Sequence, residues 1–366
     1  MKIKDIFRVT RGSVLAADKV LLSKIDGYEY PVYSSQTKAD GLLGYYNTYL
    51  YENAITWTTD GANAGTVHYR AGKFYCTNVC GVLLNKDGYA NRCTAAILGS
   101  ISKKYVSYVG NPKLMNNIMS EIPIIIPALE EQHKIDSFIA VLDKRIKAQQ
   151  MMITSLKKYK RGVVRSLLSP ENCKLKDAQW NRDTIGNLGS FIKGAPLSKA
   201  DISTTGTPFI LYGELYTTYY EVITSVVRTT DAEVDSVYRS IVGDVLIPTS
   251  GETPEEISTA SCVMLPGVIL AGDLNIFRSS KVDGRIMSYI LNHIVNGCIA
   301  RLAQGKSIVH IQASEISKIE ISYPDPETQD RIVRVLEAIS SRVEYCEKEL
   351  DNLTKMRGSL LQQLFI

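Results

Sequence analysis

The sequence lacks the residue patterns on which most nucleotide-dependent and metal-dependent enzymes rely. Its four histidines are too few and too dispersed to predict a metal site or a general base: His68, His133, His293 and His310. No phosphate-binding GxxxxGK[ST] loop is present, because Gly305-Lys306-Ser307 carries only its last three letters. None of the 38 Asp and Glu residues is followed two places later by Lys, which excludes the acid-x-Lys arm of a common nuclease metal site. We therefore expect a recognition protein with no catalytic residues, no cofactor and no metal.

Long apolar runs and close cysteine pairs are also missing. No apolar run reaches the length that crosses a membrane, and the first seven residues are charged, unlike a secretory leader. The seven cysteines are an odd, scattered number, which favours free thiols in a reducing cytoplasm. A zinc site made by Cys76, Cys80 and His68 is the weaker alternative, since no second close cysteine pair accompanies it. The composition, 45% hydrophobic, predicts two or three globular domains.

What the sequence does contain is a long amphipathic segment, Lys134 to Leu168, that occurs a second time 197 positions later. Both copies keep an apolar seam at steps of four and three, which is typical of helices that pair along their length. The first seam comprises Ile135, Ile139, Leu142, Ile146, Gln149, Ile153, Leu156, Lys160, Val163 and Leu167. The second comprises Ile332, Leu336, Ile339, Val343, Cys346, Leu350, Leu353, Arg357, Leu360 and Leu364. Each helix would be about 50 Å long at ~1.5 Å per residue. Two unrelated surface helices would leave this shared register to chance.

The repeat extends upstream of both helices. An alternating apolar strand is expected at residues 122–126 and 319–323, and each strand ends at a proline, Pro127 or Pro324. An acidic turn follows, and acidic residues favour a helix N-terminus. Gln132 and Gln329 also occupy equivalent positions. A repeat of this length predicts a duplicated domain rather than a solenoid.

The segments between the helices read as strands and turns. Short motifs recur in the two halves: Val9-Thr10-Arg11-Gly12 resembles Phe191-Ile192-Lys193-Gly194, and Pro31-Val32-Tyr33 resembles part of Phe209-Ile210-Leu211-Tyr212. Further strands are expected at residues 219–227, 245–248, 262–265 and 274–279. The glycine-rich run from Asp60 to Thr66 predicts a turn that serves the fold or that approaches a phosphate backbone. The fold class is therefore α+β.

Charge is distributed unevenly along the chain. Residues 1–126 carry 14 Lys and Arg against 9 Asp and Glu, and residues 127–169 carry 9 against 4. Residues 170–323 carry 13 against 17, and residues 324–366 carry 6 against 8. The N-terminal half is thus the better candidate for binding a polyanion.

Several of these features together resemble the specificity subunit of type I restriction-modification enzymes. They are the duplicated Ile-x-Ile-x-x-Pro segment, the Glu-x-Gln that follows it, and an Arg-Gly late in each helix (Arg161-Gly162 and Arg357-Gly358). The run Leu360 to Phe365, and Tyr45-Tyr46 followed by Ile55 to Gly61, also resemble this family.

The resemblance implies a non-catalytic subunit with two target-recognition domains that each read half of a split site in double-stranded DNA. The expected domains are residues 1–126 and 170–323, and the expected spacer helices are residues 127–169 and 324–366. The helices would pair antiparallel as a coiled coil, separate the half-sites and dock two methyltransferase subunits, to which restriction and translocase subunits are added. A rod of about 50 Å spans roughly 15 base pairs at ~3.4 Å each, so an unread spacer is expected.

Base reading requires polar side chains on loops that enter a groove. In the first domain the candidates are Lys38, Tyr45, Tyr46, Thr58, Thr59, Asn63 and Arg70. In the second they are Lys193, Tyr212, Thr249, Ser250, Glu252, Gln304 and Lys306. For each of them a solvated surface side chain is the simpler interpretation. A basic set on the first helix allows two interpretations, a solvated exterior or contact with DNA or methyltransferase: Lys144, Arg145, Lys147, Lys157, Lys158, Lys160 and Arg161.

Two other classes of function compete with this one. A coiled-coil scaffold whose globular ends bind protein or glycan would be indifferent to DNA, whereas a recognition subunit has duplex affinity that falls steeply with salt. A stand-alone nuclease or methyltransferase would need the signatures that the sequence lacks.

Overall fold

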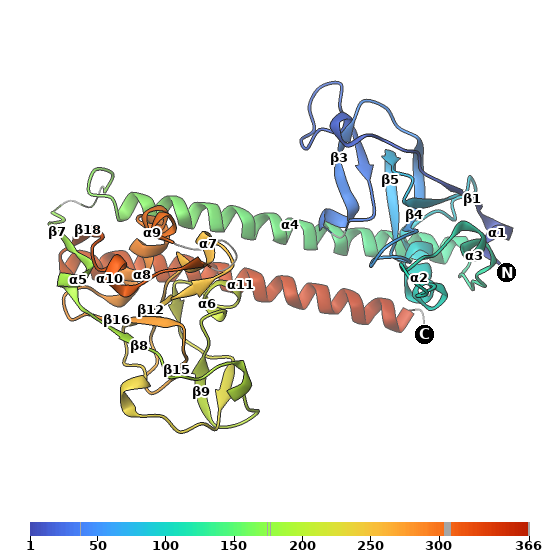
Figure 1. Cartoon of the computed structure of the whole chain (residues 1–366). Coiled ribbons are helices and arrows are strands. Elements are labelled where there is room, and N and C mark those ends of the chain that lie inside the picture. Colours follow the sequence, from blue (N-terminus) through green and yellow to red (C-terminus); the bar gives the residue numbers. More distant parts are fainter. Residues whose placement is uncertain (37, 174, 176, 304–308, 365–366) are drawn as a thin grey trace. The chain divides into compact units, whose positions relative to one another are not determined.

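The chain folds into two compact units. A computed structural model describes residues 1–36, 38–173, 175, 177–303 and 309–364. The first unit contains Met1–Met151 and Glu347–Ile366, and the second contains Met152–Cys346. Each unit includes one strand-rich domain and a part of two long helices, α4 (Leu129–Leu167) and α11 (Pro326–Leu364), which are green and red in Figure 1. None of the described helices could span a membrane.

The first strand-rich domain is built on one six-stranded sheet with the order β1-β6-β4-β5-β2-β3. The strands are β1 (Arg8–Arg11), β2 (Tyr30–Tyr33), β3 (Leu42–Tyr46), β4 (Tyr51–Thr58), β5 (Val67–Cys76) and β6 (Cys80–Leu84). Neighbours are antiparallel except for β2 and β5, which run parallel. Trp57 on β4 is buried in the core, and its indole Nε1 donates a hydrogen bond to the carbonyl of Leu114 at 2.9 Å. A Cβ at Gly81 would lie 2.1 Å from that indole, so only glycine fits there.

Short helices cover this sheet and lead into α4. They are α1 (Ile3–Ile6), η1 (Ala17–Lys19), η2 (Lys38–Gly41), α2 (Arg92–Ile101), η3 (Ser102–Tyr105) and α3 (Asn116–Glu121). Asn91 caps α2, because its side-chain oxygen accepts a hydrogen bond from the backbone N–H of Thr94 at 2.9 Å. The predicted turn after Asp60 is present, with Gly61 and Gly65 at φ values of 92° and 81°.

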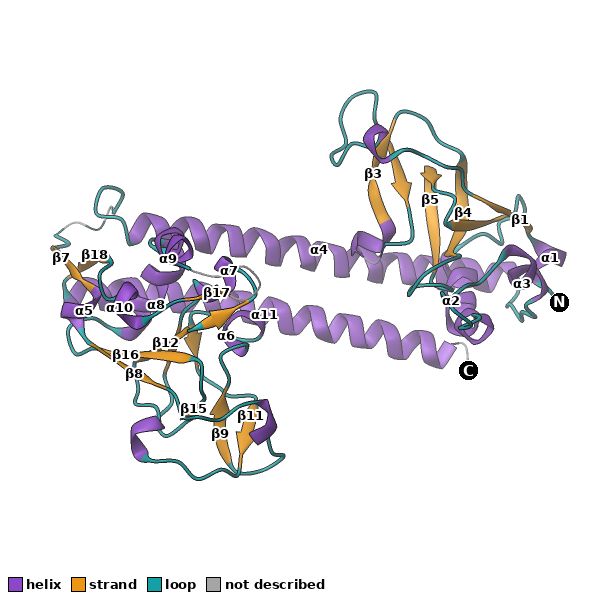
Figure 2. Cartoon of the chain, in the orientation of Figure 1, coloured by secondary structure: helices purple, strands orange, loops and turns teal. Residues whose placement is uncertain are grey.

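The second strand-rich domain contains a five-stranded sheet, β10-β14-β12-β16-β8, and a three-stranded sheet, β11-β9-β15 (Figure 2). These strands are β8 (Ser190–Lys193), β9 (Thr207–Ile210), β10 (Val222–Ile223), β11 (Arg228–Thr230), β12 (Asp244–Pro248), β14 (Ser261–Val263), β15 (Ile269–Leu270) and β16 (Leu274–Arg278). Two further pairs join β13 (Ser250–Gly251) to β17 (Val309–His310) and β18 (Glu320–Pro324) to β7 (Trp180–Thr184).

Helices in the second domain are short, apart from α8. They are α5 (Ile185–Leu188), η4 (Lys199–Asp201), α6 (Glu214–Thr217), η5 (Ser236–Tyr238), α7 (Pro254–Ile257), α8 (Gly284–His293), α9 (Asn296–Leu302) and α10 (Ala313–Ile316). The buried face of α8 packs with β12, β16 and the first turns of α11 in a single apolar core.

The two domains repeat one strand order, as the recurring sequence motifs predicted. Strands β8, β16 and β12 pair as β1, β6 and β4 do. Strand β9 pairs antiparallel with β11 and parallel with β15, which matches the pairing of β2 with β3 and β5. The long β5 of the first domain is represented by two shorter strands, β14 and β15, in the second. The duplicated fold is therefore visible in the sheet topology.

Within each unit, α4 and α11 run antiparallel. In the first unit, Asp143 accepts a hydrogen bond from Arg357 at 2.6 Å and Glu349 accepts one from Gln149 at 3.1 Å. In the second unit, the sulfur atoms of Met152 and Cys346 lie 3.8 Å apart. Every predicted seam residue is buried or half-buried except Leu364, which is 46% exposed. The predicted seam therefore lies on the less exposed side of both helices, and both helices begin about a turn and a half before the first seam residue.

Two strand predictions were wrong in part. Residues 122–126 alternate in burial as expected but form no strand. Among the described residues they pair with Met1 to Ile3, through three hydrogen bonds and one isolated bridge. The equivalent β18 pairs with all five residues of β7. In the segment 219–227 only Val222 and Ile223 form a strand, because α6 ends just before it and β14 offers a two-residue register.

Candidate nucleic-acid interface

A buried glutamine joins the first strand-rich domain to α4. Gln132 has no exposed surface, and its side-chain N–H donates to the carbonyl of Pro127 at 2.9 Å. Its side-chain oxygen accepts hydrogen bonds from the Asn91 amide at 2.8 Å and the Thr94 hydroxyl at 3.0 Å. Both partners belong to the start of α2, so one amide connects the proline turn, the domain and the long helix.

The equivalent glutamine makes the same connection in the second unit. Gln329 donates to the carbonyl of Pro324 at 2.8 Å, and its oxygen accepts the backbone N–H of Asp283 at 2.8 Å. Asp283 caps α8, as Asn91 caps α2. The repeated Glu-x-Gln motif thus has a physical role, which is to hold each domain on its own long helix.

A cavity of about 180 Å³ in the first domain brings together three of the predicted residues, Thr58, Asn63 and Arg70. Arg70 is buried, its guanidinium lies 3.7 Å from the centre of the Tyr33 ring, and it donates to Thr56 and to the carbonyl of Asp40. Residues on alternating positions of β4 and β5 line the same face. The sequence did not single out Ser34, Gln36 and Asp40, which also line the cavity, and it pointed to His68 only as a possible zinc ligand.

Burial and the charge of Arg70 lower the pKa of His68 to about 4, so this imidazole is neutral at pH 7. Burial likewise raises the pKa of the Cys76 thiol and raises that of Cys80 to about 11. A protonated thiol is a poor zinc ligand, and no cluster of three or more His, Cys, Asp or Glu residues occurs in the described parts of the chain.

The other candidates of the first domain do not line this cavity. Tyr45 and Tyr46 lie on β3, where Tyr46 packs edge-on against Tyr28 and Tyr75. Thr59 is buried and donates to Asp60 at 2.7 Å. Lys38 begins η2.

In the second domain, Asp273 brings two predicted residues to one turn. Thr249 donates its backbone N–H to the Asp273 carbonyl at 2.8 Å. The ammonium group of Lys193 is attracted by the negative charge of Asp273, and it donates a hydrogen bond to the Asn275 side chain at 2.8 Å. Burial is the larger effect on Lys193, so its pKa lies below its ordinary value. Asp273 has a φ of 58°, an uncommon conformation for a residue other than glycine.

The remaining candidates of this domain are dispersed. Ser250 is buried in the β13–β17 pair, Glu252 is exposed beside the cap of α7, and Tyr212 packs against an apolar cluster. Gln304 and Lys306 lie outside the described residues.

The basic set on α4 divides into buried and exposed members. Lys160 occupies a seam position and is buried, and its Nζ donates to Glu221 of the strand-rich domain at 2.7 Å. The ring of His293 reaches the other oxygen of Glu221 at 2.6 Å. Lys157 contacts Tyr220, and Arg145 pairs with Glu349 at 3.3 Å. Lys144, Lys147, Lys158 and Arg161 are exposed.

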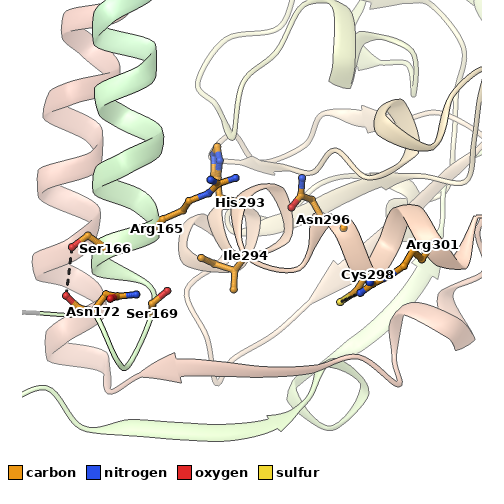
Figure 3. A pocket seen from close by; sticks show the side chains of 10 residues that line it. Arg165, Ser166, Ser169, Asn172, His293, Ile294, Asn296, Cys298 and Arg301 are labelled. Carbon is orange, nitrogen blue, oxygen red and sulfur yellow. Dashed lines mark hydrogen bonds between the residues drawn. The ribbon is translucent and has the colours of Figure 1, made fainter.

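An open cavity of about 740 Å³ in the second unit was not predicted from the sequence (Figure 3). Its walls come from the last turn of α4, the following turn, the end of α8 and α9. The lining residues are Arg165, Ser166, Ser169, Asn172, His293, Ile294, Asn296, Gly297, Cys298 and Arg301. Figure 3 shows the α4 end with Ser166 and Asn172 at one side of the cavity and Cys298 with Arg301 at the other. The two arginines are far apart in sequence, and no motif links them.

Comparisons with known proteins agree with the duplicated architecture. A family model described as "Type I restriction modification DNA specificity domain" matches residues 1–158 and 178–355. A putative type I specificity subunit of Mycoplasma pneumoniae is 37% identical over 147 residues, which is 39% of this chain and 47% of that protein. The type I restriction enzyme MpnII specificity subunit of the same organism is 36% identical over 146 residues, 39% of this chain and 43% of its own length. The matched segment thus spans about half the length of these curated relatives.

Solved structures share the fold along the whole chain. The crystal structure of a type I restriction-modification S subunit from M. genitalium has a TM-score of 0.69 at 16% identity, covering 100% of this chain and 95% of that one. A chain from a structure that describes complex assembly of a type I restriction-modification system has a TM-score of 0.57 at 13% identity, covering 100% and 96%. On the strength of a family match that covers both halves, this chain belongs to the type I restriction-modification DNA specificity family.

Proposed function

We propose that this chain is the DNA-recognition subunit of a type I restriction-modification complex and that each strand-rich domain reads one half of a split DNA site. The observation that carries the proposal is the duplication: the same strand order and the same glutamine contact occur on both long helices. Two copies of one reader suit a target in two parts. The proposed readers are residues 1–126 and 170–323, and the proposed spacer segments are residues 127–169 and 324–366.

The long helices suit the role of a spacer between half-sites. Each contains 39 residues, which corresponds to about 58 Å at ~1.5 Å per residue. Neither helix contains an internal proline, and the apolar seam continues along both. A stiff element of this length supports a fixed number of unread base pairs.

Base reading by the first domain would use the cavity that holds Thr58, Asn63 and Arg70, together with Lys38, Thr59, Tyr45 and Tyr46 around it. In the second domain it would use the turn at Asp273 with Lys193 and Thr249, together with Tyr212, Ser250, Glu252, Gln304 and Lys306. Hydroxyl, amide and guanidinium groups of this kind match the donors and acceptors of base edges.

The helices also offer a pair of equivalent surfaces for two copies of one protein partner. Exposed apolar side chains recur 197 positions apart: Phe138 and Val335 are 49% and 46% exposed, and Tyr159 and Met356 are 60% and 46% exposed. Their recurrence at equivalent positions of the repeat supports one kind of partner surface that is present twice. We propose that each surface docks a methyltransferase subunit, and that restriction and translocase subunits join the same complex in the cytoplasm.

The chain itself contributes no catalytic group in this proposal and needs no cofactor of its own, because its sequence contains none of the nucleotide-binding or nuclease patterns discussed above. Modification and cleavage would reside in the partner subunits.

Co-expression with a type I methyltransferase, followed by genome-wide mapping of methylated adenines, tests the proposal. The expected result is one sequence made of two defined parts with an unread middle, methylated only when this chain is present. Duplex affinity of the complex should fall steeply with salt concentration. A complex that is indifferent to DNA would instead support the scaffold alternative.

A further inference from the structure

The open cavity between the end of α4 and α9 holds positive charge that no carboxylate balances. Residues 170–323 contain more acids than bases, 17 against 13. The cavity lining nevertheless includes two arginines and contains no Asp or Glu; His293, which also lines it, contacts Glu221.

Most other arginines of the same domain are neutralised locally, and the exception, Arg239, donates to the Gly267 carbonyl at 3.3 Å. The four that pair with carboxylates are Arg182, Arg228, Arg278 and Arg285. Neither Arg165 nor Arg301 forms an ion pair with any described residue; Arg301 donates only to the Cys298 sulfur at 3.3 Å. The two cavity arginines therefore stand out from their neighbours and are available for an anionic ligand.

A row of exposed bases on α4 leads into the cavity. Lys158, Arg161 and Arg165 are exposed and follow one another at intervals of three and four, so they lie within about 60° of one helix face. In the described part of the chain, none of the three has a carboxylate partner. The row and the cavity together form a basic track rather than an isolated charge.

The lining also identifies the kind of anion. Ser169, Asn172 and Asn296 place hydroxyl and amide groups beside the guanidinium groups, and this set of donors is the one that contacts phosphate and sugar oxygens of nucleic acids. A volume of about 740 Å³ is much larger than one phosphate needs. A track that continues along a helix fits a chain of phosphates better than a compact ligand.

We propose that Arg301, the cavity and the α4 row bind successive phosphates of a DNA strand, and that this contact positions the duplex without reading its bases. The proposal rests on the proposed function, because it assigns a backbone contact to the same DNA.

The test uses the complete complex with its methyltransferase subunits. The double variant Arg165→Gln with Arg301→Gln removes both cavity charges, and both side chains are exposed, so folding is preserved. Fluorescence anisotropy with a duplex carrying the mapped target, repeated over a series of salt concentrations, gives the slope of log K against log[salt]. The magnitude of that negative slope should decrease by about 1.8, and affinity near 0.15 M salt should fall on the order of tenfold. The methylated sequence should stay unchanged.

The matched control is Lys199→Gln with Lys318→Gln, two exposed bases of the same domain outside the cavity. Its slope should equal that of the unmodified complex. An unchanged slope in the arginine variant, or an equal decrease in the control, overturns the proposal.

Two further measurements identify the source of the phosphate. Calorimetric titration with pyrophosphate and with ATP, in the presence and absence of the arginine substitutions, reports free phosphates. Loss of that binding with an unchanged duplex slope would reassign the cavity to a free nucleotide. Loss of methyltransferase from the purified complex would reassign it to a protein contact. An unmodified complex without DNA affinity would contradict the proposed function itself, and the pyrophosphate titration would then still decide whether the cavity binds phosphate.

Discussion

At the residue scale, the most unusual feature is a charged side chain in an apolar helix seam. Lys160 is buried at a position where heptad patterning favours an apolar residue, and it reaches Glu221 of the second strand-rich domain rather than α11. Its equivalent in the repeat, Arg357, instead bonds to Asp143 across the helix pair. The same position of the repeat thus has two roles. In the second unit Lys160 connects α4 to the strand-rich domain, and in the first unit Arg357 connects α11 to α4.

Glu221 makes this connection dependent on pH. Burial alone would raise its pKa, but the hydrogen bonds and charges of His293 and Lys160 outweigh burial and lower the pKa to about 2. A lowered carboxyl pKa gives stability that is fully present above the ordinary glutamate value of about 4.3 and is lost as pH falls toward 2.

We therefore predict that Glu221→Gln destabilises the protein by about 3 kcal/mol at pH 7, because Lys160 is left buried without a carboxylate. The difference from the unmodified protein should shrink between pH 4.3 and 2, where Glu221 itself becomes neutral. Thermal unfolding followed across this pH range measures it. The control is Glu320→Gln, which breaks the exposed pair with Arg182 and should cost less than about 1 kcal/mol. A difference that persists undiminished near pH 2 would contradict this account.

At the scale of single elements, the glutamine contact is an attachment of domain to helix that both units repeat. Gln132→Leu would leave the Pro127 carbonyl, the Asn91 amide and the Thr94 hydroxyl without their partner. Each buried polar group that loses its hydrogen bond costs about 1–3 kcal/mol. We predict a loss of roughly 3 kcal/mol in unfolding free energy, measured by denaturant titration, and the same direction for Gln329→Leu.

The two variants should also differ in which half-site they affect. The assay measures methylation of DNA that carries a base substitution in one half-site. Gln132→Leu should make methylation less sensitive to substitutions in one half-site only, and Gln329→Leu should do the same for the other. Gln362→Leu, on an exposed part of α11, serves as the control and should change neither stability nor specificity. An equal effect of both buried variants on both half-sites would argue against a domain-specific role.

The exposed apolar positions give a second prediction for the long helices. Phe138→Ser and Val335→Ser change equivalent sites, so each single variant should retain one methyltransferase per chain and the double variant should retain none. Mass measurement of the purified complex distinguishes two, one and no partner subunits. Leu22→Ser, at an 89% exposed apolar residue outside the helices, should retain two.

These elements differ in how far the sequence predicts them. The helices and their seam follow from spacing alone, because a heptad pattern records which face is buried. Strand positions such as β12 and β16 also follow from apolar runs, whereas residues 122–126 do not become a strand, since strand formation depends on the partner that the fold supplies. The contact of Lys160 with Glu221, and the presence of Arg165 and Arg301 in one cavity, depend on tertiary geometry that no local pattern contains.

The candidate base readers show the same limit. Thr58, Asn63 and Arg70 do meet in one cavity, because β4 and β5 pair and place alternate residues on one face. His68 and Asp40 belong to that cavity as well, although their sequence neighbourhood carries no signal of it. In the second domain the predicted residues are spread over several turns, since each was chosen from its own loop.

For the whole molecule, the proposed function implies that the length of the long helices sets the distance between the two half-sites. We predict that inserting one heptad into α4 and one into α11 lengthens the unread spacer and leaves both half-sites unchanged. Seven residues preserve the seam and add about 10 Å at ~1.5 Å per residue, or roughly three base pairs at ~3.4 Å each.

Insertion after Gln150 and after Glu347 keeps both domains and both glutamine contacts intact. Methylation mapping in cells that carry the variant complex reads the spacer directly. A seven-residue insertion beside Val109, in an exposed loop of the first domain, is the control and should leave the spacing as it was. If the doubly extended chain assembled with its methyltransferase and still methylated the original spacing, the helices would have to be docking surfaces alone, and the separation of the half-sites would have to be determined by the partner subunits.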